Sequence, residues 1–178
     1  MNNNCQVEKL CGFYVSDWHL VTTILPYISS KIDNHTKVIT ILENNIEENI
    51  KILMQKLNLK NKEEILNINW KNLNCIKYAN IERILNQQFM NNIENIILIS
   101  GNKNYIKSVN NNVYKWLKKY NIKKFKIVNF FEVTEFNNDI VNILDDHDKI
   151  LNTSGEKEIA EVFDGYQKNN FKKVVNNI

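Results

Sequence analysis

The chain has 178 residues, of which 43% are apolar and 24% charged, and its net charge is +3. This length and composition are ordinary for a globular protein, and we expect residues 1–178 to form a single domain. The small charge, with basic residues spread along the chain, disfavours nucleic-acid binding. No apolar run approaches the roughly 18 to 20 residues that span a bilayer.

The first expected elements are a strand at residues 9–15, a helix, and a second strand at residues 37–43. Apolar residues recur along one face of the helix, and Asp17 is placed to cap its start. Pro26, the only proline, falls inside the helical pattern and predicts a kink or a division into two pieces. The β-branched residues of the second segment favour a strand.

The middle of the chain continues the alternation. Two glutamates from Glu47 onward suit the positive end of a helix dipole. A short strand at residues 65–70 and a helix at about residues 80–90 follow. Residues 94–100 contain a continuous apolar run bounded by Gly101, which is typical of a strand buried on both faces.

The last third has the clearest helix, at residues 105–120, where apolar residues recur at spacings of three and four. A strand at residues 124–132, a short helix at residues 139–144 and a final strand at residues 149–152 come next. Residues 153–156, Thr-Ser-Gly-Glu, resemble a capping box, which predicts a last helix after the final strand.

Strands separated by helices predict an α/β fold: a three-layer sandwich with a mainly parallel sheet of five to six strands and helices on both faces. Sheets of this kind bind ligands beyond the carboxyl ends of their strands. Tyr14, Glu43 and Glu132 all fall at expected strand ends, so we expect them along a common edge.

The sequence lacks the motifs of the common nucleotide sites. It contains neither GxxxxGK[ST] nor GxGxxG, so we expect no classical NTP hydrolysis and no NAD binding. Ser16, Asp17 and His19 supply the atoms of a catalytic triad, but Asp17 is better explained as a helix cap. We therefore expect a protein that is not an enzyme and needs no cofactor.

Cysteine and histidine form no recognisable metal motif. Cys5, Cys11 and Cys75 contain no CxxC pair, and their odd number does not indicate a disulfide framework. Cys11, His19 and His147 are not at metal-ligand spacing, so we expect no metal. The polar start of the sequence lacks a signal-peptide pattern, so we expect a cytoplasmic protein with reduced thiols.

Two further patterns each have two interpretations. Glu43 and Glu132 are either a carboxylate pair or separate residues that cap helices or face water. Aromatic residues near the strand ends either wall a small-molecule pocket or pack in the core. These aromatic residues are Tyr14, Trp18, Trp70, Phe131 and Phe136.

Several short motifs, taken in order and spacing, resemble one family. Residues 10–14 and 37–41 are similar to its first two strands, residues 99–102 to a strand followed by glycine, and residues 127–132 with Phe136 to its penultimate strand. His147 falls where the family has a histidine before its last strand. From about residue 9 to 155 the chain resembles the MEDS domain, the methanogen/methylotroph DcmR sensory domain; residues 156–178 would form a C-terminal helix and tail.

The sequence departs from this family pattern at four places. Lys9 stands where a histidine is common, and Val15 stands where an acid often follows the aromatic pair. Asn102 replaces an acid after the glycine, and Asp148 replaces a proline after the histidine.

The resemblance implies a RecA/KaiC-like domain without phosphate-binding motifs, from a family proposed to sense small hydrocarbon derivatives in bacterial and archaeal signalling. Many members carry a DNA-binding or kinase module, which these residues do not contain. We therefore expect a non-catalytic sensor that binds a small organic ligand and signals through a regulatory protein partner or a homo-oligomer, without nucleic acid or membrane. The expected ligand-binding residues are Tyr14, Asp17, His19, Glu43, Trp70, Glu132 and His147.

Two alternatives remain. The chain is a protein-interaction module derived from a RecA-like ATPase, which binds no small ligand and uses exposed aromatic residues such as Tyr114. Otherwise it is an enzyme in which Glu132 and His147 act as acid and base.

Overall fold

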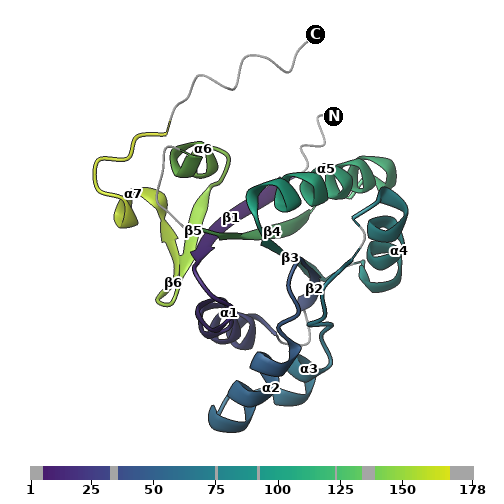
Figure 1. Ribbon diagram of the computed structural model, residues 1–178. Helices are drawn as coiled ribbons and strands as arrows, with labels where there is room; N and C mark the ends of the chain where they lie inside the picture. The colour runs from purple at the N-terminus through teal and green to yellow at the C-terminus, as the bar shows by residue number, and fades with distance from the viewer. Residues whose placement is uncertain are drawn as a thin grey trace.

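The computed structural model describes residues 6–32, 36–74, 76–91, 93–122, 124–133 and 139–168. A six-stranded sheet in the order β2-β3-β4-β1-β5-β6 forms its middle layer (Figure 1). Strands β1 to β5 run parallel, and β6 is antiparallel to β5. The strands are β1 Gln6–Tyr14, β2 Thr36–Leu42, β3 Glu94–Gly101, β4 Lys124–Glu132, β5 Lys149–Asn152 and β6 Gly155–Glu158.

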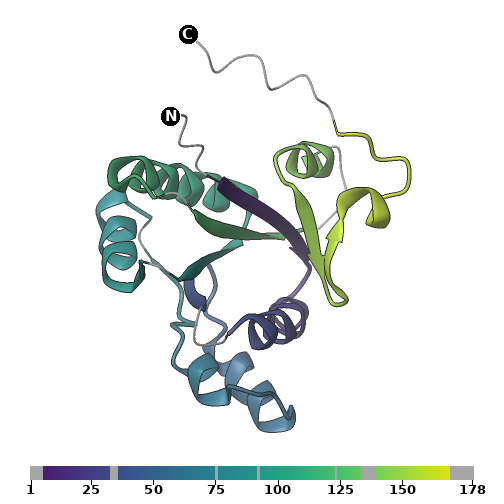
Figure 2. The same ribbon diagram turned by 180° about the vertical axis from the view of Figure 1, so that it is seen from behind.

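Helices cover both faces of the sheet, which confirms the expected three-layer α/β sandwich. The first face carries α1 Asp17–Lys31, α2 Glu47–Lys56 and α3 Lys62–Leu66. The second carries α4 Tyr78–Gln88, α5 Lys103–Tyr120 and α6 Asp139–Asp145. Both views show these two groups on opposite sides of the sheet (Figures 1 and 2). The short helix α7, Ile159–Val162, follows β6.

The two apolar layers follow from the alternation of side chains along the strands. In β3, Ile97 and Ile99 pack toward α5, whereas Ile96 and Leu98 pack toward α1. Both sets are fully buried, as expected for a parallel strand covered on both faces. None of the described helices is long and apolar enough to cross a membrane.

The connections place the topological switch point of the sheet between β1 and β4 at the carboxyl edge. After β1 the chain leaves toward the α1 face, whereas the helix that follows the neighbouring strand β4, α6, lies on the α5 face. Adjacent strands whose connections leave to opposite faces open the crevice in which such sheets bind ligands. The ends of β1 and β4 are therefore the first place to look for a site.

The start of α1 and its proline differ from the expectations. The N-cap residue is Ser16, whose hydroxyl accepts a hydrogen bond from the His19 amide at 3.2 Å, so Asp17 is the first helical residue instead. The helix is a single element through Pro26, not two pieces. Pro26 faces solvent, while its buried neighbours Leu25 and Tyr27 anchor both halves of the helix to the sheet.

Two other expected elements are wrong. Residues 65–70 form no strand; the end of α3 and a loop occupy them, and only a single bridge joins Leu42 to Asn72. Residues 153–156 do not begin a helix. They turn the chain back from β5 into β6, with Asn152 paired to Gly155, whose φ of +97° suits glycine. The next helix begins only at Ile159.

Candidate functional site

The ends of β1 and β4 bring two predicted residues side by side. Tyr14 and Glu132 are partners in the parallel register and lie on the strand positions that face α1. Tyr14 is only 1% exposed, whereas Glu132 is exposed at the rim. Within the described part of the chain the Tyr14 hydroxyl has no hydrogen-bond partner. A buried hydroxyl without a partner costs about 1–3 kcal/mol, so it needs an explanation.

Three carboxylates lie close enough to the Tyr14 hydroxyl to affect its pKa. Burial raises the pKa of Tyr14, and the nearby charges of Glu132, Asp17 and Glu43 raise it further. The hydroxyl therefore keeps its proton at neutral pH and remains a hydrogen-bond donor. The structure thus brings Tyr14, Asp17, Glu43 and Glu132 to one edge. The Tyr14 hydroxyl is a hydrogen-bond donor that lies near these three carboxylates but bonds none of them.

Glu43 also forms hydrogen bonds at this edge. Its carboxylate accepts hydrogen bonds from the backbone and side-chain amides of Asn102, both at 2.6 Å. Asn102 in turn caps α5 by accepting from the Tyr105 amide at 3.0 Å. Glu43 therefore braces the residue that caps α5, and it does not cap α2, the helix that follows it in the chain.

Gly101 allows this close contact. A Cβ atom at this position would lie 2.5 Å from a carboxylate oxygen of Glu43 and 2.9 Å from the Tyr105 ring, and the φ angle is +153°. Both the space and the backbone conformation therefore require glycine.

Two more buried hydroxyls lie at the edge, and neither was expected from the sequence. The side-chain hydroxyls of Ser100, at the end of β3, and of Tyr105, in the first turn of α5, have no hydrogen-bond partner among the described residues. Burial and the charge of Glu43 raise the pKa of Tyr105. The sequence pattern that identifies Tyr14, a polar residue at the end of an expected strand, also applies to Ser100 and could have indicated it.

His19 lies at the same edge, in the first turn of α1. Its ring is exposed, and Nδ1 accepts a 3.4 Å hydrogen bond from the backbone amide of Val15. Val15 and Trp18 beside it are 65% and 46% exposed. Both large apolar side chains face solvent next to the acidic groups.

Trp70 is not part of this group of polar side chains. It is 2% exposed and packs in the apolar layer beneath α1 and α2, with its indole nitrogen donating to the Ile65 carbonyl at 2.8 Å. Its polar atom is already satisfied within the fold. The structure therefore supports a packing role for Trp70.

His147 also lies away from the edge, because it precedes β5 and so stands near the amino end of that strand. Its Nδ1 atom is 2.6 Å from the Ile143 carbonyl, which can only accept, so Nδ1 carries the proton. Nε2 then accepts from the Asn129 amide at 2.9 Å. Burial lowers the pKa of His147 to about 4, which keeps the ring neutral.

Several expected groupings are not brought together. His147 contacts the Phe131 ring on the α5 side, whereas the next residue, Glu132, points to the other face, so this acid and base do not face each other. Phe131 and Tyr14 likewise lie in opposite layers. Tyr114 is half-buried, with the Lys9 ammonium 5.7 Å from its ring centre. Phe136, Cys5 and Cys75 lie outside the described residues.

The edge has the chemistry of a binding site for a polar molecule. On the α1 face it offers the donor of Tyr14, the hydroxyl of Ser100 and the negative charge of Glu132, while Tyr105 packs in the layer on the α5 face. In the part of the chain described here, no three histidine, cysteine or acidic side chains converge as metal ligands. Cys11 is buried, and burial raises the pKa of its thiol to about 12. No family model matches the sequence, and no curated protein is significantly similar to it.

Proposed function

We propose that this chain is a non-catalytic cytoplasmic sensory domain that binds a small organic ligand at the carboxyl edge of its sheet and signals through a protein partner or a homo-oligomer. The observation that carries the proposal is the Tyr14 hydroxyl, which is buried without a partner where β1 and β4 end, at the topological switch point of the sheet. A ligand that accepts its hydrogen bond would remove the cost of the unsatisfied donor.

The charges at the edge indicate what else the ligand carries. The negative charges of Glu132, Asp17 and Glu43 all raise the pKa of the Tyr14 hydroxyl. A molecule with an amine or several hydroxyl donors suits these carboxylates better than an anion does. We therefore expect small amines and amino alcohols to bind more tightly than carboxylic acids of the same size.

The brace between Glu43 and Asn102 offers a route for the signal. A ligand donor that bonds Glu43 competes with the two amides of Asn102 at the start of α5. Ligand binding would then change the population of a loosened first turn of α5, which a partner recognises. Such a shift needs a difference in ligand affinity between the two states, and the competition for Glu43 provides one.

The test is a thermal-shift screen of the protein with small alcohols, amines and acids. We expect amines to raise the unfolding midpoint and Tyr14→Phe to reduce that response, with a threefold to tenfold weaker affinity for the loss of about one hydrogen bond. Tyr27→Phe is the matched control, because it also removes a buried tyrosine hydroxyl close to a carboxylate, that of Glu156, but lies away from the edge. A screen without any shift, or equal responses in both variants, would contradict the proposal.

A second function, a protein-interaction module that needs no small ligand, is favoured by one observation. Val15 and Trp18 expose large apolar surfaces directly beside the edge. If they form a docking site, a partner that co-purifies from native extract would bind in the absence of any ligand. Replacing Trp18 by glutamine would release that partner without changing the thermal stability of the domain.

A further inference from the structure

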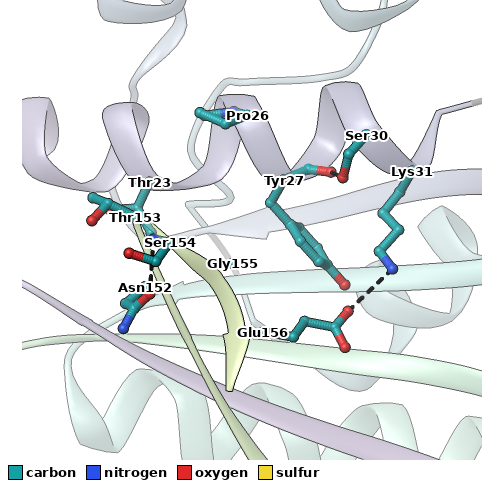
Figure 3. Close-up of a pocket in the computed structure, with 10 residues that line it drawn as sticks. All are labelled: Thr23, Pro26, Tyr27, Ser30, Lys31, Asn152, Thr153, Ser154, Gly155 and Glu156. Carbon is teal, nitrogen blue, oxygen red and sulfur yellow. Dashed lines mark hydrogen bonds and ion pairs between the residues drawn. The ribbon is translucent and has the colours of Figure 1, made fainter. Parts of the chain in front are cut away.

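Cavities lie on both faces of the sheet, and their charges differ. Figure 3 shows the groove between α1 and the hairpin of β5 and β6, in which the Tyr27 hydroxyl points toward the Glu156 carboxylate. That carboxylate lies 3.3 Å from the Lys31 ammonium and 3.0 Å from that of Lys126. The polar groups of this groove are therefore engaged with one another, and they indicate no ligand.

The second cavity lies between α5 and α6 and has a volume of about 320 Å³, at the small end of the range for small-molecule sites. Helix α5 forms one wall, and α6 with the turn that follows it forms the other. Two strands contribute one residue each, Lys9 of β1 and Phe131 of β4. The apolar part of the lining is Ile106, Tyr114, Phe131 and Ile143, which suits the body of an organic molecule.

Lys9 is an unusual residue for its position. It belongs to the central strand β1, and the alternation of side chains places it on the α5 face together with Cys11, which is fully buried. Lysine is rarely buried in such a layer unless a carboxylate pairs with it. The Lys9 ammonium lies 5.7 Å from the centre of the Tyr114 ring, and within the described part of the chain it forms no ion pair. It is therefore partly dehydrated without a direct anionic partner.

The carboxylates around Lys9 do not replace that partner. Asp148 accepts a hydrogen bond from the backbone amide of Lys9 at 3.0 Å and pairs with Lys168 at 3.6 Å. Asp146 lines the cavity but is exposed to solvent. Burial lowers the pKa of Lys9, and the charges of Asp146 and Asp148 offset this lowering only in part. His147, also in the lining, is neutral.

Helix α5 brings two more ammonium groups to the same cavity. Lys103 and Lys107 lie one turn apart at exposed positions and line its wall. Like charges at this spacing repel each other, and an anion beside them reduces that repulsion. The lining thus contains three lysines and one acidic residue, so its charge favours an anion.

We propose that the cavity between α5 and α6 binds a small carboxylic acid with an apolar body, whose carboxylate pairs with the Lys9 ammonium while its body packs on Phe131 and Ile143. The ligand supplies the anionic partner that the fold does not give to Lys9. Lys107 would stabilise the same charge from the solvent side. This site differs from the carboxyl edge in ligand charge and does not depend on the function proposed for that edge.

The test is an NMR titration of the full chain with benzoate, hexanoate, benzamide and benzylamine, followed through backbone amide shifts. We expect benzoate or hexanoate to perturb the amides of Asn110, Ile143 and Asp146, which lie along the two walls. Benzamide has the same ring as benzoate without its charge, so it should bind at least about tenfold more weakly. Benzylamine should leave these amides unchanged.

Three variants assign the effect to Lys9. Lys9→Met keeps an unbranched apolar side chain and removes the charge, so it should weaken benzoate binding about tenfold to a hundredfold, as for a lost hydrogen bond to a charged group. Lys107→Gln removes an exposed charge and should weaken binding by less than about fivefold. Lys115→Gln is the matched control, because this exposed lysine of α5 lies outside the lining, and it should bind as the wild type does.

Four results would overturn the proposal. They are a panel in which neither carboxylate perturbs the walls, benzamide or benzylamine binding there as tightly as benzoate, Lys9→Met binding as tightly as the wild type, and inorganic phosphate competing equally with benzoate, since the apolar lining would then play no part. If Lys9→Met did not fold, the comparison of benzoate with benzamide in the wild type would decide. The carboxyl edge is tested separately by its response to amines and by Tyr14→Phe, so either site can fail without the other.

Discussion

The Glu43 carboxylate holds Asn102 with two hydrogen bonds of 2.6 Å and so joins the end of β2 to the first turn of α5. Asn102 follows β3, the neighbour of β2, so this contact closes the carboxyl edge between two adjacent strands. The same carboxylate contributes to the acidic surroundings of Tyr14. One residue therefore couples the candidate ligand site to the start of a helix on the opposite face.

Replacing Glu43 tests the strength of this brace. Glu43→Ala removes two charge-assisted hydrogen bonds, and we expect it to lower the free energy of unfolding by about 2–3 kcal/mol. Glu43→Gln keeps one acceptor and should lose less. Urea denaturation measures both, and Glu48→Gln, at an exposed position in the first turn of α2, is the control that should change stability by less than about 0.5 kcal/mol.

Gly101→Ala should be more damaging than Gly155→Ala. At Gly101 the new methyl group meets Glu43 at 2.5 Å and Tyr105 at 2.9 Å, in addition to the positive φ angle. At Gly155 the φ angle is also positive, but nothing lies within 4 Å of the added atom. We expect a loss of about 1–2 kcal/mol at Gly155 from backbone strain alone and a clearly larger loss at Gly101. Equal losses in chemical denaturation would show that the contact with Glu43 is not tight.

Removing an unpartnered hydroxyl should not cost stability. Tyr14→Phe and Tyr105→Phe each delete a buried hydroxyl without a partner, so we expect midpoints of thermal unfolding equal to or above that of the wild type. Tyr166 provides the contrast, because its hydroxyl donates to Asp145 at 2.7 Å. Tyr166→Phe should lose about 1 kcal/mol. A large loss in Tyr14→Phe or Tyr105→Phe would reveal a partner for that hydroxyl.

His147 should make the stability of the domain depend on pH. Its pKa is about 4 in the folded protein, against the ordinary value of 6.5 expected in the unfolded chain, so the unfolded chain binds the extra proton first as the pH falls. The stabilisation is complete above pH 6.5 and is lost as the pH falls toward 4, by up to about 3 kcal/mol. Urea denaturation at pH 7.5, 6 and 5 measures the slope. His147→Gln should be less stable at pH 7.5 and should flatten the dependence; an unchanged slope would contradict a neutral, buried ring.

The spacing of apolar residues was enough to predict most of the fold. The runs at 124–132 and 149–152 predict strands with the same bounds as β4 and β5, and the 105–120 pattern predicts α5 to within two residues. The parallel direction follows from the helices between the strands, and it places Tyr14 beside Glu132. These features depend on local periodicity, which the sequence contains.

The features that sequence reasoning missed depend on competition between local patterns and tertiary pairing. Residues 153–156 match a capping box, but pairing with β5 turns them into a hairpin in which Gly155 adopts a positive φ angle. His147 precedes a strand, yet its side chain reaches Asn129 in the middle of β4. The unpartnered hydroxyls of Tyr14 and Tyr105 follow from packing across several elements, which no spacing along the chain encodes.

A ligand site at the carboxyl edge can be detected directly by NMR chemical-shift mapping of the full chain with a library of small amines and amino alcohols. We expect a binding compound to perturb the amides of Ser16, Glu43, Asn102 and Val133, which surround Tyr14 and its neighbours at the edge. We also expect Tyr14→Phe to weaken these changes. A library without any saturable perturbation, or with perturbations confined to other surfaces, would contradict a ligand site at this edge.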